Sequence, residues 1–132
     1  MPEPPAIARW HEIVRTHDAA KLDALLADDA VFFSPVVYAP QAGRALTKAY
    51  LAAALEVIGG GAFRYVGEWF AENSAALEFE AMIDGVEVNG ADFIAWDDAD
   101  RIVRFKVMLR PLRAIELVRQ RMAERLAVRP PA

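Results

Sequence analysis

The sequence predicts an α+β fold, in which N-terminal helices pack against one curved antiparallel sheet. Over residues 6–57, apolar side chains recur mainly at helical spacing, whereas from residue 62 to residue 110 they alternate with a period of two. Turn-forming residues divide this second region into four strands. Helices and an antiparallel sheet that are segregated along the chain are typical of α+β domains. We expect three helices to cover one face of the sheet, which gives a cone with an apolar interior.

Helices are expected before the sheet over residues 6–16, 19–26 and 45–57, with a short strand at residues 31–33. On the first of them, Trp10 and His11 lie on the apolar face with Ile7 and Val14, because these positions are spaced three and four residues apart. Three consecutive glycines, Gly59 to Gly61, end the last one. These helices account for the N-terminal half of the domain.

The four strands are expected over residues 62–69, 75–83, 86–96 and 103–109, and a C-terminal helix follows over residues 112–126. Asp84-Gly85 is a strong hairpin signal, and the aspartate-rich stretch 97–100 is typical of a tight turn. In the first strand, Phe63, Tyr65 and Trp69 are expected to share one face. We interpret the whole chain, residues 1–132, as one domain, with residues 1–5 and 127–132 as flexible tails.

Asp92 breaks the apolar pattern of the third strand of this meander. Side chains two residues apart on a strand point to the same side, so Asp92 shares a face with Val88, Ile94 and Trp96. A carboxylate on an apolar face costs free energy unless a partner compensates it. Groups perturbed in this way tend to mark functional sites. We therefore expect Asp92 to face the interior of the cone, where Trp10 N–H is the first partner to consider.

Composition excludes several classes of function. A net charge of −4 argues against nucleic acid as the main partner, since phosphate binding needs a basic face. The chain has no cysteine, which excludes disulfides and thiol nucleophiles, and two histidines make a histidine-based metal site improbable. Neither a signal peptide nor a membrane-spanning run is evident. We expect a cytoplasmic protein that uses no metal and no organic cofactor.

Residues 17–31, HDAAKLDALLADDAV, resemble the segment from the second helix to the first strand of the NTF2-like superfamily. Residues 92–102 resemble its last hairpin, with Asp100 where many members have glycine, and residues 107–112 with the arginine-rich segment after them are similar to SnoaL-like members. The resemblance implies an NTF2-like cone. It leaves activity open, because this fold carries isomerases, hydrolases, cyclases and non-catalytic binders.

Within the superfamily, comparison with ketosteroid isomerases implies roles for three positions. Asp92 falls at the position of their protonated aspartate, Trp10 at that of their tyrosine, and Ser34 at that of their aspartate base. Serine is no carboxylate base, and the indole of Trp10 donates a hydrogen bond but does not titrate. The resemblance therefore argues against ketosteroid isomerase activity while it keeps Asp92 as a candidate acid or base.

We predict that the cone binds a small, largely apolar molecule. Asp92 is the candidate catalytic residue, for cofactor-free proton transfer of the isomerase, cyclase or hydratase type. Its pocket is expected to be lined by Trp10, His11, Ser34, Tyr50, Trp69, Trp96 and Phe105. The alternative is a non-catalytic ligand-binding or dimerisation module whose cone is filled by aromatic side chains. Arg104, Lys106 and Met108 are expected on the opposite, outer face of the sheet, through which members of this superfamily commonly form homodimers.

Overall fold

The structure, a computed structural model, describes residues 2–128. Its elements are, in chain order, α1 (Pro5–Thr16), a 3-10 turn η1 (Ala19–Lys21), α2 (Leu22–Leu25), β1 (Leu26–Phe33), β2 (Gln41–Ala42), α3 (Arg44–Val57), β3 (Arg64–Phe70), β4 (Ser74–Ile83), β5 (Val86–Trp96), β6 (Ile102–Arg110) and α4 (Leu112–Val128). This is the α+β order of an NTF2-like cone, with three helices before the four-stranded meander. The sheet is curved and not closed.

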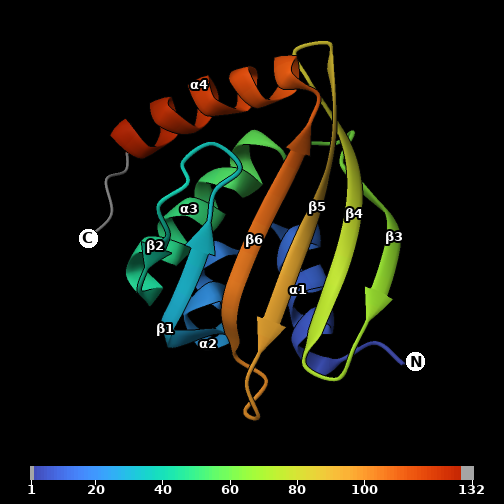
Figure 1. The fold of residues 1–132 in the computed structure, drawn as a ribbon, viewed down its shortest axis with the longest axis vertical. Helices are drawn as coiled ribbons and strands as arrows, with labels where there is room; N and C mark the ends of the chain where they lie inside the picture. Colours follow the sequence, from blue (N-terminus) through green and yellow to red (C-terminus); the bar gives the residue numbers. More distant parts are fainter. Residues whose placement is uncertain (1, 129–132) are drawn as a thin grey trace.

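The six strands form one sheet in the order β2-β1-β6-β5-β4-β3 (Figure 1). Strands β3 to β6 pair antiparallel, as expected for a meander. Strand β1 differs from the all-antiparallel expectation because it runs parallel to β6. Parallel neighbours need a long crossover, and the chain between these two strands contains α3 and the rest of the meander.

The helices lie on one side of the sheet, and the core sits between them and its inner face. Figure 1 shows α1 and α2 behind the strands, and α4 leaving the end of β6 to run beside α3. Alternate positions of β4 and β5 are buried, which follows from the period of two in their sequences. None of the helices in the described part of the chain combines the length and the apolar character needed to cross a membrane.

The two hairpins that flank β5 have the turn chemistry expected from the sequence. Asp84 and Gly85 have φ angles of 49° and 78°, the left-handed pair that a tight two-residue turn requires. At the last hairpin, the Asp97 Oδ1 atom accepts hydrogen bonds from the backbone N–H groups of Ala99 and Arg101. These turns fix the register of β5 against both of its neighbours.

Several boundaries differ from the sequence-based expectation. The second helical segment ends at Leu25, one residue before the expected end. Strand β1 begins at Leu26 instead of residue 31, and its side chains at Leu26 and Ala30 are buried in the core. Helix α1 begins at Pro5, where proline needs no N–H partner, and α4 continues to Val128, so both extend into the predicted tails. Of those tails, residues 1 and 129–132 lie outside the described residues.

Strand β3 changes face part of the way along. Tyr65 pairs with Phe79, whereas Gly67 pairs with Glu78, so Val66 is an extra residue on the β3 side. Such a bulge shifts the alternation by one position, and every later side chain turns to the other face. Tyr65 therefore faces the interior, while Trp69 lies on the outer face and is 60% exposed.

Candidate functional site

Asp92 lies in the middle of β5, between Leu77 of β4 and Val107 of β6 in the register. Both neighbours are buried, and Asp92 itself is only 5% exposed. It shares its face with Val88, Ile94 and Trp96, all of them buried. Among the described residues, Asp92 is the only buried one with an ionisable acidic or basic side chain. Such a group needs hydrogen-bond partners, and the structure supplies a short chain of them.

This series of hydrogen bonds runs from α1 through β3 to β5. The Trp10 indole Nε1–H donates to the Tyr65 hydroxyl oxygen over 2.8 Å, and the Tyr65 O–H donates to Asp92 Oδ2 over 2.6 Å. The expected direct bond from Trp10 to Asp92 is therefore replaced by one through a tyrosine. Because the Tyr65 hydroxyl both accepts and donates, it satisfies Trp10 Nε1–H and Asp92 Oδ2 at the same time.

Burial dominates the acid–base properties of the pair. Desolvation raises the pKa of Asp92 from 3.8 to about 7, and the hydrogen bond from Tyr65 opposes that rise. The pKa of Tyr65 is raised well above 10, first by burial and then by the negative charge of Asp92. Asp92 is thus the member of the pair that exchanges a proton near neutral pH. That range suits a general acid or base.

A cavity of about 40 Å³ adjoins the chain of hydrogen bonds. Trp10, Tyr65, Phe79, Asp92 and Phe105 line it, together with residues of α3. Trp10 packs edge-on against Phe105, with ring centroids 4.8 Å apart, so this part of the cavity wall is aromatic. This volume holds one small polar group of a ligand or a water molecule. A larger apolar cavity of about 190 Å³ lies next to it, and Ala54, Ile58 and Val107 line both.

The residues that the sequence predicts for one pocket lie in several parts of the structure. Trp10, Phe105 and Asp92 line the small cavity, whereas Ser34 and Tyr50 line the larger one. Ser34 Oγ also accepts from the backbone N–H groups of Val36 and Val37, which shapes the loop after β1. Trp96 is buried in the core but lines neither cavity, so its predicted role in the pocket is corrected.

His11 also lines neither cavity, and its ring contacts Glu68 of β3, the last strand of the sheet. Its Nδ1 atom is 2.7 Å from Glu3 Oε2, and its Nε2 atom is 2.7 Å from Glu68 Oε2. Among the described residues, these three form the group whose ligand atoms lie close enough to hold a metal ion.

Trp69 is the clearest correction, because it faces away from the interior that it was expected to line. The bulge at Val66 reverses the alternation, so Tyr65 takes the inward place instead. The sequence places Tyr65 on this strand, but nothing in the pattern indicates its role at the site. Tyr65 lies two residues after Phe63, so the alternation predicts that both side chains face the same side, and both line the small cavity. The alternation does not indicate that Tyr65 binds Asp92 on β5.

Comparisons with known proteins agree on one family. The SnoaL-like domain family matches residues 7–105. A steroid delta-isomerase from Pseudomonas aeruginosa is 35% identical, with 93% of this chain and 90% of that chain covered and a TM-score of 0.88. An uncharacterized protein with a cystatin-like fold from Silicibacter pomeroyi is 30% identical, with 95% and 87% covered and a TM-score of 0.87.

A more distant structure agrees in fold alone. A hypothetical protein with a ketosteroid isomerase-like fold from Catenulispora acidiphila, in complex with trimethylamine, is 16% identical over 80% of this chain and 85% of that one, with a TM-score of 0.61. No curated protein matches the sequence. The matched segment spans most of the chain and contains Trp10, Ser34, Tyr65 and Asp92. The chain belongs to the SnoaL-like domain family and has the ketosteroid isomerase-like, NTF2-like fold.

Proposed function

We propose that this protein binds a small, largely apolar molecule in its cone and moves a proton of that molecule with Asp92, without a cofactor. The observation that carries the proposal is a buried carboxyl group that adjoins an aromatic cavity and whose pKa is about 7. Such a group is present in both protonation states at neutral pH, so it can take a proton and return it. The SnoaL-like family is one that often binds small molecules and includes some isomerases.

The chemistry that fits is a proton shift next to a carbonyl group. Ionised Asp92 removes a proton from the carbon beside the carbonyl, which leaves an enolate on the ligand. Neutral Asp92 then returns a proton to the same carbon, which is hydrogen exchange. Where a β,γ double bond extends the enolate, the proton returns to the γ-carbon and the double bond moves into conjugation with the carbonyl, so no atom is gained or lost. Trp10 N–H and Tyr65 O–H already donate within the Trp10–Tyr65–Asp92 series of hydrogen bonds. Tyr65 O–H stabilises the oxygen on which negative charge develops only when it turns from Asp92 to that oxygen.

Asp92 has to serve as both acid and base in this scheme. Among the described residues that line the two cavities, Asp92 is the only carboxylic acid, and Ser34 stands where ketosteroid isomerases have their aspartate base. The similar protein from Pseudomonas aeruginosa is named a steroid delta-isomerase. For the present chain we expect proton transfer on a different or smaller carbonyl compound, because the second carboxylate is missing.

The test is deuterium exchange at the carbon beside a carbonyl, followed by proton NMR with 4-phenyl-2-butanone in D₂O. The protein is expected to accelerate the exchange, and Asp92→Asn is expected to remove at least nine-tenths of that acceleration. Asp29→Asn is the matched control, because Asp29 lies exposed on β1 and lines neither cavity. Equal exchange rates with the wild type and with Asp92→Asn would refute a catalytic role for Asp92.

The second candidate is a non-catalytic ligand-binding module. The small volume of the cavity beside Asp92, about 40 Å³, favours it, because aromatic side chains fill much of that space. This alternative expects saturable binding of an apolar compound by calorimetry with no exchange above the rate in buffer. The exchange experiment therefore separates the two functions with the same protein sample.

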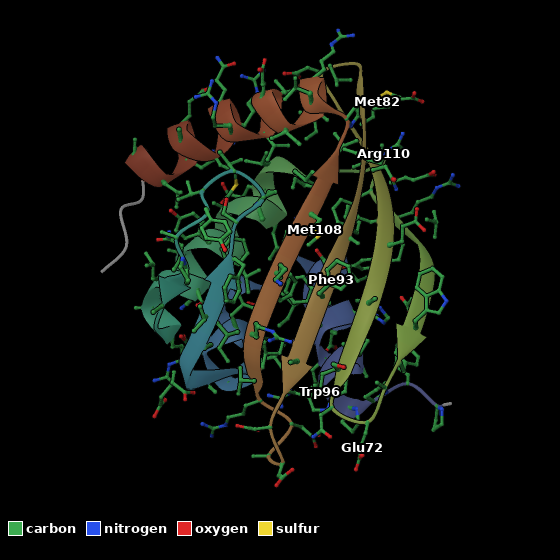
Figure 2. The ribbon with its side chains drawn as sticks, viewed as in Figure 1. Glu72, Met82, Phe93, Trp96, Met108 and Arg110 are labelled. Atoms are coloured by element: carbon green, nitrogen blue, oxygen red, sulfur yellow. The ribbon has the colours of Figure 1, made fainter. Side chains whose placement is uncertain are left out.

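We also propose a homodimer that forms through the outer face of the sheet. Figure 2 shows Phe93 of β5 and Met108 of β6 near one another on the face that the helices leave open. Trp69, Met82, Phe93 and Met108 are exposed there, and apolar patches of this kind are typical of interfaces. Arg104 and Lys106 flank them with charge. The cytoplasmic location expected from the sequence stays a prediction.

A further inference from the structure

Helix α4 covers a second apolar compartment, which adjoins the small cavity that Asp92 lines. Its volume is about 190 Å³, which exceeds the roughly 150 Å³ of an engineered apolar cavity that binds benzene. Phe32, Tyr50, Val118 and Met122 form its walls, from β1, α3 and α4. The compartment is therefore large enough for an aromatic ring or a short branched hydrocarbon.

The compartment continues toward Asp92. Ala54 of α3, Ile58 just after that helix and Val107 of β6 line both this compartment and the small cavity, so these three side chains form the partition between them. The small cavity holds only one polar group of a ligand, as its volume shows. A ligand that places one polar group beside Asp92 can extend past these three side chains into the compartment under α4.

The polar groups on the outer compartment are hydrogen-bond donors. Arg119 of α4 lines it, and no ion pair joins Arg119 to another described residue. Ser34 Oγ already accepts two backbone N–H groups, which leaves its own O–H free to donate. The Tyr50 hydroxyl, also on this wall, has no hydrogen-bond partner in the described part of the chain. A cation and two hydroxyl groups, with no carboxylate beside them, suit an anionic oxygen ligand.

We propose that the ligand is an apolar monocarboxylic acid with a ketone at its other end. Its carboxylate binds Arg119 at the rim, its hydrocarbon body fills the compartment under α4, and its ketone reaches the Tyr65–Asp92 pair past the partition. This inference rests on the proposed ligand-binding role of the cone and adds the class of molecule. Arg119 is a binding residue here and takes no part in proton transfer.

The test compares a carboxylate with its neutral amide by isothermal titration calorimetry. The probes are 4-phenylbutanoate and 4-phenylbutanamide, which have the same ring and chain length. The wild type is expected to bind the carboxylate at least tenfold more tightly than the amide. Arg119→Gln is expected to lose that preference through weaker carboxylate binding, with the affinity for the amide unchanged. Arg113→Gln is the matched control, because Arg113 is exposed on the same helix and lines neither cavity.

The outcomes separate this inference from the proposed function. Equal binding of the carboxylate by the wild type and Arg119→Gln, equal affinity for the two probes, or binding of neither probe would overturn the inference. Deuterium exchange in 4-phenyl-2-butanone, which has no carboxylate, would still decide the role of Asp92. Loss of exchange in Asp92→Asn together with unchanged carboxylate preference in the same variant would support both proposals.

Discussion

Replacing Asp92 with asparagine is expected to change how stability depends on pH. Below pH 3.8 the carboxyl group is protonated in the folded and the unfolded protein, so it adds no pH dependence. Between pH 3.8 and about 7 the unfolded chain releases the proton while the folded protein keeps it. The folded state then binds more protons, so the free energy of unfolding falls as pH rises.

The size of this effect follows from the two pKa values. Each unit of difference between the folded and the unfolded pKa corresponds to about 1.4 kcal/mol. A rise from 3.8 to about 7 therefore removes about 4 kcal/mol of stability once the pH is above 7. The asparagine side chain of the variant would carry no charge, but its amide N–H groups would need new partners, at a cost of about 1–3 kcal/mol.

The assay is urea unfolding of the wild type and Asp92→Asn at a series of pH values from 4 to 8. The variant is expected to be the less stable protein near pH 4 and to gain about 4 kcal/mol relative to the wild type by pH 8. The difference between the two proteins is the quantity to plot, since other carboxyl groups contribute equally to both. A difference that stays constant over this range would refute the raised pKa of Asp92.

Three further outcomes are expected. Tyr65→Phe leaves Trp10 Nε1–H and Asp92 Oδ2 without their partners, which should lower the free energy of unfolding by about 1–3 kcal/mol. The same change should raise the pKa of Asp92 above about 7 in a carbon-13 NMR titration, because the hydrogen bond from Tyr65 lowers that pKa. Tyr38→Phe, at a fully exposed position, should change neither quantity. Gly90→Ala would place a Cβ atom 2.5 Å from Phe79 Cζ and 2.7 Å from Met108 O, so it should destabilise the fold by about 1–3 kcal/mol in urea unfolding, whereas the Cβ of Gly60→Ala meets nothing within 4 Å and should leave the sheet packing intact. Phe93→Glu should convert the proposed dimer to monomers in sedimentation velocity, and a wild-type protein that sediments as a monomer would contradict the proposed interface.

The place of Asp92 could be predicted because alternation within one strand is a local property. Val88, Asp92, Ile94 and Trp96 lie at even spacing, and apolar neighbours identify the buried face. The hairpin at Asp84-Gly85 was predictable for a similar reason, since its residue types set the backbone angles of the turn. Both predictions needed only residues close together in the chain.

The partners of Asp92 could not be predicted in the same way. Tyr65 lies 27 residues before Asp92, and the bulge at Val66 decides which face the end of β3 presents. The sequence around Val66 carries no strong signal for that extra residue. Trp69 was therefore assigned to the interior, although cross-strand pairing with Ala76 turns it outward.

The sequence by itself determined the α+β class, the order of the meander and the inward direction of one carboxyl group, because period and turn chemistry act within a few residues. Only the tertiary structure decided that β1 runs parallel to β6, that Tyr65 links Trp10 to Asp92, and that α4 covers an apolar compartment beside them. These features depend on register and packing between segments far apart in the chain. Local spacing leaves several such arrangements open, and the burial of the shared core selects one.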